Sequence, residues 1–237
     1  MKKLTTRILQ KISIPRTTYL TDCNICKSRK FTLGPNCRRS PTGLYPRCIS
    51  CKSLERHRIQ RKISLQLQEI FGFNNLAALR FSNDPSFSPD WFKSFETSIY
   101  DGENSLDVQA IDRDSESYDV IIINHVLEHV QDDKKALKEL ARIINKTGFI
   151  FISVPQTISM PKTIDWGYPD EAQHGHFRHY GKDFSNLLSE TCSDLYWIRI
   201  YDFDPVTYTP DEVYILSHSR ETIGLISNAC KMSNLYS

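Results

Sequence analysis

The hydrophobic positions of this chain change their period along the sequence. Ile59, Ile63 and Leu67 recur every four residues and are followed by Ile70 or Phe71. This spacing predicts an amphipathic helix that begins near residue 53. Residues 118–124 and 149–154 are short, nearly continuous apolar runs instead. Such runs are typical of parallel strands that are covered on both faces. The chain therefore predicts an α/β fold.

A helical pattern separates these two apolar runs. Asp132 or Asp133 can cap its start, and Gly148 lies past its expected end. Its apolar stripe consists of Ala136, Leu137, Leu140, Ile143 and Ile144. A strand, a crossover helix and a second strand at this spacing predict a βαβ unit.

Five weaker patterns complete the predicted sheet. Residues 77–81, 97–100 and 106–110 are expected to form three strands before the βαβ unit. Residues 197–201 and 213–216 flank turn signals and predict a closing antiparallel hairpin. The expected architecture is a doubly wound, mostly parallel seven-stranded sheet.

The composition excludes several classes of protein. Hydrophobic residues make up 40% of the 237 residues and charged residues 24%, which excludes a mainly disordered chain. No run of 18 apolar residues occurs, so no membrane span is expected. Residues 1–12 combine an apolar stripe with basic residues, which fits a transit peptide, an interfacial helix or a basic helix packed on the rest. We favour the packed helix and a cytoplasmic protein.

Four cysteines have the spacing of a zinc ribbon. Cys23 and Cys26 form one Cys-x₂-Cys pair, and Cys48 and Cys51 form a second pair 21 residues later. Each pair offers two sulfurs to one tetrahedral Zn²⁺, and metal binding would supply folding free energy to a module too small for a large core. Two disulfides or free thiols are the alternatives. Cys37, between the pairs, is expected to be a spare thiol.

The near-zero net charge of +2 hides two oppositely charged parts. Residues 1–62 hold 16 basic and two acidic residues, a net charge of +14, and the remainder holds 14 basic and 26 acidic residues, a net charge of −12. The basic part would bind a polyanion, or the two parts would neutralise each other by docking. The predicted organisation is a basic N-terminal segment (1–22), a zinc ribbon (23–53), a linking helix (54–74), a catalytic domain (75–220) and a C-terminal tail (221–237).

The βαβ segment resembles a known enzyme family. Asn124-His125-Val126-Leu127-Glu128-His129-Val130, with the preceding strand and the following helix and strand, is similar to the central segment of class I S-adenosylmethionine-dependent methyltransferases, most closely the type-11 group. Residues 176–184 resemble an H-x-R-x-Y-G-x-D segment of a subgroup that bears a zinc ribbon. The resemblance covers residues 23–188 and implies a Rossmann-like fold and two cofactors, S-adenosylmethionine and Zn²⁺.

The resemblance also implies a set of site residues at the carboxyl ends of the strands. Asp101 or Glu103 would bind the ribose hydroxyls, and Asp107, with Val108 beside it, would bind the adenine amino group. The implied cofactor-binding residues are Phe81, Asn83, Asp84, Asp101, Asp107, Val108, Asn124 and His125. The candidate catalytic and acceptor-binding residues are His125, Glu128, His176, Arg178 and Tyr180.

Structural roles compete with several of these assignments. Glu128 could cap the next helix, Arg178 could form an ion pair with the acidic part, and His57 is expected at the solvated surface near Cys51. His174 and His176 are weak evidence for a second metal, since no carboxylate pattern lies nearby in the sequence.

One departure from the family concerns the loop after the first predicted strand. The family usually has a glycine-rich turn there, whereas residues 80–87 contain no glycine. A non-catalytic binding module that contacts nucleic acid or protein is therefore the alternative to an enzyme. For an enzyme, the expected acceptor is a glycan precursor or another small metabolite, or an RNA held with help from the basic ribbon.

Overall fold

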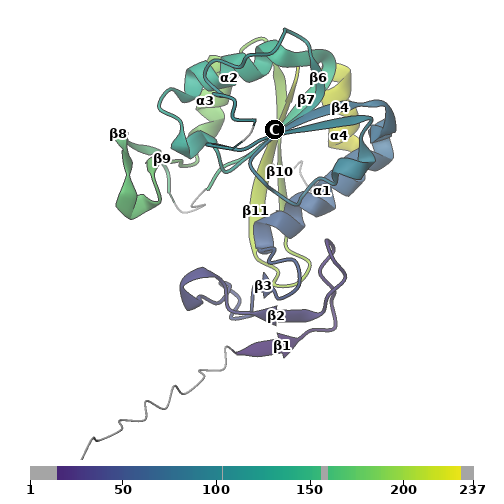
Figure 1. The fold of residues 1–237 in the computed structure, drawn as a ribbon, viewed down its shortest axis with the longest axis vertical. Coiled ribbons are helices and arrows are strands. Elements are labelled where there is room, and N and C mark those ends of the chain that lie inside the picture. Colours follow the sequence, from purple (N-terminus) through teal and green to yellow (C-terminus); the bar gives the residue numbers. More distant parts are fainter. Residues whose placement is uncertain (1–14, 103, 156–159, 231–237) are drawn as a thin grey trace, which may run out of the picture.

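The computed structural model describes residues 15–102, 104–155 and 160–230, and its largest element is a mixed sheet of six strands (Figure 1). The strand order is β10-β11-β7-β6-β4-β5. The bounds are β4 Ala77–Phe81, β5 Ser94–Ser98, β6 Tyr118–Asn124, β7 Ile144–Ser153, β10 Tyr196–Phe203 and β11 Pro210–Ser217. Strands β4 to β7 are parallel, and the β10–β11 hairpin is antiparallel to β7.

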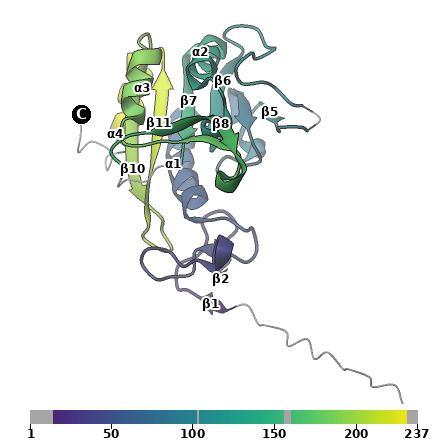
Figure 2. The ribbon, with the colours of Figure 1, turned by 90° about the vertical axis from the view of Figure 1, so that its left-hand side faces the viewer.

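Helices cover both faces of this sheet (Figures 1 and 2). Helix α1 (Glu55–Phe71) and helix α4 (Arg220–Ala229) lie on one face, and α2 (Asp133–Ile143) and α3 (Phe184–Thr191) lie on the other. Short 3₁₀ turns are η1 Pro35–Cys37, η2 Phe73–Asn75, η3 Pro89–Trp91, η4 Leu127–His129 and η5 Glu171–Gln173. The predicted doubly wound α/β architecture is confirmed.

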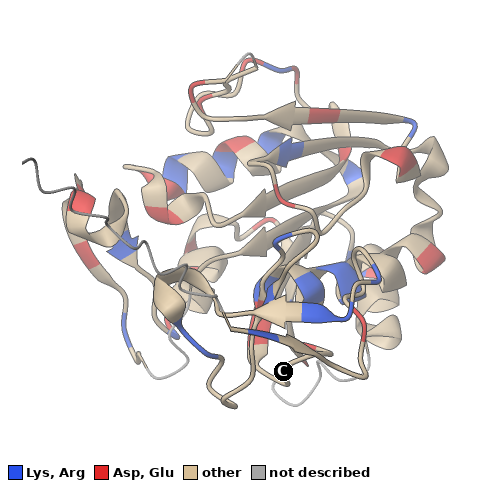
Figure 3. Cartoon of the chain, turned by 60° about the horizontal axis from the view of Figure 1, so that its bottom comes forward, with Lys and Arg blue, Asp and Glu red and all other residues tan. Residues whose placement is uncertain are grey.

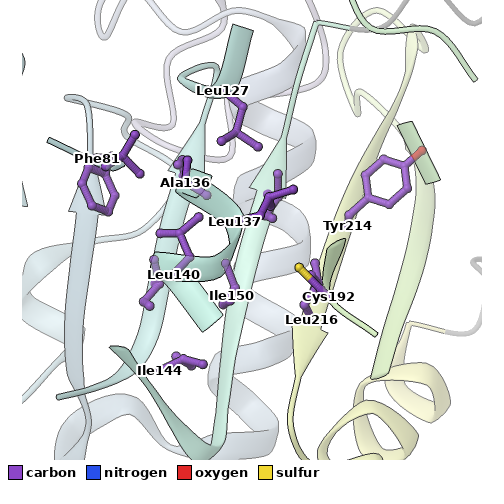
Figure 4. Packing of buried hydrophobic residues seen from close by; sticks show 14 of the residues in the cluster. Phe81, Leu127, Ala136, Leu137, Leu140, Ile144, Ile150, Cys192, Tyr214 and Leu216 are labelled. Carbon is purple, nitrogen blue, oxygen red and sulfur yellow. The ribbon is translucent and has the colours of Figure 1, made fainter. Parts of the chain in front are cut away.

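Alternate residues of the central strands pack into two separate hydrophobic cores, one on each face of the sheet. Ile121 and Ile123 of β6 pack in the cluster under α2 and α3, part of which Figure 4 shows. Val120 and Ile122 pack in the cluster under α1 and α4. Because both faces of β6 are buried, its sequence is continuously apolar rather than alternating.

The prediction of seven strands is wrong for the described residues. Residues 106–110 form turns, because the Asp107 carbonyl accepts a hydrogen bond from the Ala110 N–H and the Asp107 carboxylate accepts one from the Gln109 N–H. These local bonds replace a strand ladder. The second strand also lies earlier than expected, at Ser94–Ser98.

The helix of the βαβ unit begins as predicted and ends earlier. Asp132 caps α2, since its side chain accepts a hydrogen bond from the Lys135 N–H at 2.9 Å. Gly148 does not terminate α2 but lies inside β7. A Cβ atom at Gly148 would stand 2.6 Å from the Asp119 carbonyl oxygen of β6. Glycine is therefore needed here for the close approach of two strands.

The cysteine-rich module is a three-stranded antiparallel sheet of β1 (Arg16–Thr18), β2 (Lys30–Thr32) and β3 (Arg47–Cys48). Strand β1 comes from the segment that we expected to precede the ribbon, so the small sheet extends across residue 22. The helix expected at residues 1–12 lies outside the described residues. The expected tail begins with α4, which packs against α1.

The tip of the β10–β11 hairpin docks on the cysteine-rich module (Figure 2). Arg58 of α1 forms two 2.7 Å hydrogen bonds to Asp204, and both side chains are fully buried. Val206 packs with Cys23, Phe31 and Cys48 in a third cluster. Figure 3 shows basic positions on the strands of this module and on the helix behind it. The basic and acidic parts of the chain therefore dock on each other. This was one of the two alternatives that the charge pattern predicted.

A smaller hairpin, β8 (Ile164–Asp170) and β9 (His176–His179), projects from the main sheet (Figure 1). Its strand β9 contacts η4. Among the described residues, no helix combines the length and apolar character that crossing a membrane requires.

Candidate functional site

A polar pocket of about 210 Å³ opens at the carboxyl ends of β4 and β6. It is lined by Arg56, His57, Ser82, Asn83, Asp84, Asn124 and His125. Helix α1 contributes the first two residues, Asn124 is the last residue of β6, and the loops after β4 and β6 contribute the others. The carboxyl ends of neighbouring parallel strands are where doubly wound folds bind ligands.

The loop after β4 is held in place without glycine. Ser82 adopts a positive φ of 78°, a conformation that glycine would adopt with less strain. The Asp84 carboxylate accepts a hydrogen bond from the Ser86 N–H at 2.7 Å, and Arg80 donates one to the Asp84 carbonyl at 2.6 Å. Side-chain bonds thus fix a turn for which the family that the sequence resembles usually has glycines.

A chain of buried hydrogen bonds supports the base of the pocket. Gln60 of α1 donates to the Ser153 hydroxyl at 2.7 Å, and this hydroxyl donates to the Asn124 side chain at 2.9 Å. All three residues are buried. Since these bonds join α1, β6 and β7, they hold the helix start over the strand ends.

Two pocket residues present nitrogen atoms without partners. His125 has a positive φ of 54°, its Nδ1 lies 3.5 Å from Glu128 Oε1, and its Nε2 is buried without a hydrogen bond in the described structure. Arg56 Nε is buried and unpartnered in the same way. Because unsatisfied buried polar atoms cost free energy, both atoms indicate a site for a ligand with polar groups, and the Arg56 Nε–H requires an acceptor.

His57 is not the surface residue that the sequence suggested. Its Nδ1 accepts a hydrogen bond from the Leu54 N–H at 3.1 Å, and its Nε2 lies 3.8 Å from the Asp84 carboxylate. Burial lowers the pKa of His57 to about 4, although the charge of Asp84 raises it. The ring is therefore neutral at physiological pH, and it caps α1 while it lines the pocket.

The structure brings together four of the predicted cofactor-binding residues, namely Asn83, Asp84, Asn124 and His125. The others lie outside the pocket lining. Phe81 and Val108 are buried in the core, and Asp101 and Asp107 are exposed beyond β5. Glu103, the alternative to Asp101, lies outside the described residues. Sequence reasoning missed Arg56, His57 and Ser82 as pocket residues. The run Glu55-Arg56-His57-Arg58 after the second cysteine pair was the only signal for the first two, and Ser82 opens the glycine-free loop after β4.

Arg178 and Tyr180 have structural contacts. The Arg178 guanidinium donates to the Asp165 carboxylate at 2.7 Å and to the carbonyls of Leu127, Val130 and Gln131. The Tyr180 hydroxyl donates to Asp133 at 2.8 Å, and burial raises the Tyr180 pKa. Both residues attach β9 and the segment after it to η4 and α2, and neither lines the pocket. The ion pair of Arg178 with the acidic part was one of the two predicted alternatives.

Glu128 and His176, the other two candidate catalytic residues, lie close together beside His129. Burial lowers the pKa of His176, and the negative charge of Glu128 opposes that shift. Glu128 borders the pocket through His125, and neither Glu128 nor His176 lines it.

The four ribbon cysteines converge on one point. Their sulfur atoms lie within 4.8 Å of one another, with Cys23–Cys51 at 3.7 Å and Cys26–Cys48 at 3.5 Å. Four thiolates about 2.3 Å from one Zn²⁺ at tetrahedral corners stand roughly 3.8 Å apart. A disulfide would need about 2.05 Å, so the spacing fits a tetrahedral ion and excludes these pairs as disulfides.

Comparison with known proteins assigns the chain to a family. A family model described as "Methyltransferase domain" matches residues 48–191, which is more than half of the chain. The chain belongs to this methyltransferase family. The prediction of a methyltransferase is thereby confirmed. No curated protein sequence is similar enough to this methyltransferase to count as a match.

Solved methyltransferase structures are similar to this chain at low sequence identity. The CurJ carbon methyltransferase is 12% identical, with a TM-score of 0.47, over 68% of this chain and 55% of that chain. The Burkholderia thailandensis 1,6-didemethyltoxoflavin-N1-methyltransferase, solved with S-adenosylhomocysteine, is 14% identical over 66% and 76%, with a TM-score of 0.46. A SAM-dependent methyltransferase from Aquifex aeolicus is 14% identical over 65% and 88%, with a TM-score of 0.42. At these scores the likeness adds nothing to the family match.

Proposed function

We propose that this methyltransferase uses S-adenosylmethionine as its methyl donor and binds the donor's amino acid moiety in the pocket between α1, β4 and β6. The observation that carries the proposal is the unpartnered, buried Nε of Arg56, which lines the same small pocket as Asp84. A guanidinium suits the donor's carboxylate, and a carboxylate suits its ammonium group. At about 210 Å³ the pocket is below the roughly 300–1,000 Å³ of a full cofactor site, so it suits one end of the donor.

The remainder of the donor would extend along the carboxyl end of β5. Asp101 is proposed for the ribose hydroxyls and Asp107 for the adenine amino group, because ionised carboxylates only accept hydrogen bonds. Both are exposed in the loops that follow β5, next to β4 in the sheet. When bound, the donor supplies an activated methyl group on a sulfonium.

His125 is proposed to orient or deprotonate the acceptor. Its Nε2 has no partner in the described structure, and its Nδ1 faces Glu128, which can hold the ring in one orientation. We do not extend this role to Arg178 and Tyr180, because their polar groups are used in structural bonds.

The proposed acceptor is a glycan precursor or another small metabolite rather than an RNA. RNA-binding modules of this size stack bases on exposed aromatic side chains. Phe31 is fully buried in the ribbon, and Tyr45 is covered by the Arg39 guanidinium at 4.4 Å. Part of the basic charge is also paired, through Arg38–Glu55 and Arg58–Asp204. The predicted cytoplasmic location stays a prediction.

Calorimetric titration with S-adenosylmethionine tests the donor site. We expect binding by the full chain and a loss of at least tenfold in affinity in Arg56→Met, because the donor's carboxylate would lose a charge-assisted bond worth about 1.5–3 kcal/mol. Lys62→Met is the matched control, since it removes one positive charge from the same helix at a side chain that bonds Asp202 instead.

Absence of both heat and thermal shift at millimolar donor would overturn the donor proposal and favour the non-catalytic binding module. Equal affinity of Arg56→Met and Lys62→Met would leave a donor site but remove Arg56 from it.

We also propose that Cys23, Cys26, Cys48 and Cys51 hold one structural Zn²⁺. The converging sulfurs support this assignment. The apolar cluster in the described part of the ribbon is also small, so the module needs metal binding as a source of folding free energy. We expect metal analysis of the purified protein to give zinc that Cys48→Ser loses, whereas Cys37→Ser, which changes an exposed cysteine outside the cluster, retains it. Equal zinc content in the two variants would contradict the assignment.

A further inference from the structure

Five of the seven histidines belong to two segments that meet beside the pocket. His125 and His129 follow β6, and His174, His176 and His179 surround or belong to β9. The rings of His129 and His176 lie edge to face, with centroids 4.6 Å apart. Strand β9 packs directly on η4, so this contact joins two elements that are distant in sequence.

Glu128 supplies a carboxylate to the same point. Its oxygen and one ring nitrogen from each of His129 and His176 all lie within 4.8 Å of one another. The Glu128 side chain is only 1% exposed. Its Oε2 and the Nδ1 of His176 are both buried without a hydrogen-bond partner in the described parts of the chain.

Within the described ranges, no neighbouring cation compensates this carboxylate oxygen. Strand β9 carries one buried guanidinium, that of Arg178, but its hydrogen bonds go to Asp165 and to three backbone carbonyls. The other oxygen, Oε1, lies 3.5 Å from His125 Nδ1. A buried carboxylate oxygen without a partner is costly, and the missing partner should carry positive charge.

We propose that Glu128, His129 and His176 bind a divalent transition-metal ion. Two imidazoles and one carboxylate are a ligand set that Zn²⁺ and other first-row ions accept while keeping positions open. His129 is exposed, which gives the ion a path from solvent. The ion would tie η4 to β9, and Glu128 would bridge it to His125 through its second oxygen. This site is separate from the four-cysteine site and does not require the proposed donor site.

The test measures metal binding by the full chain without donor or acceptor. Protein whose cysteine site already holds zinc is passed through a desalting column and titrated with Zn²⁺ by calorimetry, then with Co²⁺ by absorption. We expect one further equivalent of ion, with Co²⁺ d–d bands that lack thiolate charge transfer. Glu128→Gln and His176→Gln should each lower the affinity at least tenfold.

His179→Gln is the matched control, because His179 neighbours His176, with ring centroids 5.5 Å apart, but is outside the ligand set. It should bind the further ion as the unchanged chain does. Circular dichroism distinguishes loss of the site from loss of the fold. The unchanged chain failing to take up a further equivalent at millimolar Zn²⁺ would overturn the proposal whatever the variants do, and so would equal losses in all three variants.

Discussion

At the scale of single residues, His57 shows how burial decides the role of a side chain. The sequence places it between two arginines directly after the cysteine pair, which suggests a solvated position. In the fold its side chain is 16% exposed and its ring accepts the Leu54 N–H. A neutral ring is required for this bond, because a protonated Nδ1 cannot accept. The protonation state of His57 therefore affects both the start of α1, which its ring caps, and the charge of the pocket, which its ring lines.

The lowered pKa of His57 predicts a pH dependence of stability. The folded-state pKa of about 4 is below the unfolded value of about 6.5, so the unfolded chain binds more protons between these values. The stabilisation by the neutral ring is complete above pH 6.5 and is lost as the pH falls toward 4, by roughly 2–3 kcal/mol.

His57→Gln isolates this contribution, since glutamine at the third helical position can also bond the cap residue but does not titrate. We expect urea unfolding to show the unchanged chain losing stability relative to the variant as the pH falls from 6.5 to 4. A stability difference that is constant over this range would contradict the assignment.

At the scale of elements, the central strands follow directly from their residues. Continuous apolar runs give the doubly covered strands β6 and β7, and Asp132 gives the start of α2. Boundaries follow less well from the sequence. Gly148 resembles a helix terminator, but its lack of a side chain serves the approach of β7 to the Asp119 carbonyl. Local propensity cannot reveal a contact with another strand.

The two glycines Gly148 and Gly224 should respond to alanine in opposite directions. A Cβ at Gly148 would stand 2.6 Å from a backbone oxygen, so Gly148→Ala should destabilise the protein by about 1–3 kcal/mol. A Cβ added at Gly224, inside α4, would meet no neighbouring described atom within 4 Å. Gly224→Ala should therefore stabilise the protein by about 0.5–1 kcal/mol through helix propensity. Chemical denaturation measures both, and shifts of the same sign would contradict the proposed crowding.

At the scale of the whole molecule, the opposite charges of the two parts are joined at one buried contact. Arg58 lies in the first turn of α1, next to the cysteine-rich module, and Asp204 lies at the tip of the β10–β11 hairpin. The Asp204 carboxylate also accepts hydrogen bonds from the Thr207 N–H and hydroxyl. Both charges are hydrogen-bonded within the fold. The two parts are therefore held in one defined orientation by directional bonds, and not only by the attraction between their opposite net charges.

Removing one partner of this pair should be more harmful than removing both charges. Arg58→Met leaves Asp204 buried without its cation and should cost about 3–5 kcal/mol. Adding Asp204→Asn should recover part of this loss, since the amide oxygen can still accept from Thr207. Lys62→Met, which breaks a pair that is 45% exposed on the lysine side, should cost below about 1 kcal/mol. Urea unfolding compares the variants, and a double variant no more stable than Arg58→Met would contradict this account.

The sequence by itself determined the α/β class, the methyltransferase family, the cysteine cluster and four pocket residues. Each of these depends on local periodicity or on a motif within one segment, as for Asn124 and His125 at the carboxyl end of β6. Only the tertiary structure decided that Arg56 and His57 line the pocket, that six strands form the sheet, and that Glu128 meets His176. These features depend on contacts between distant segments, which no local pattern of hydrophobicity or charge encodes.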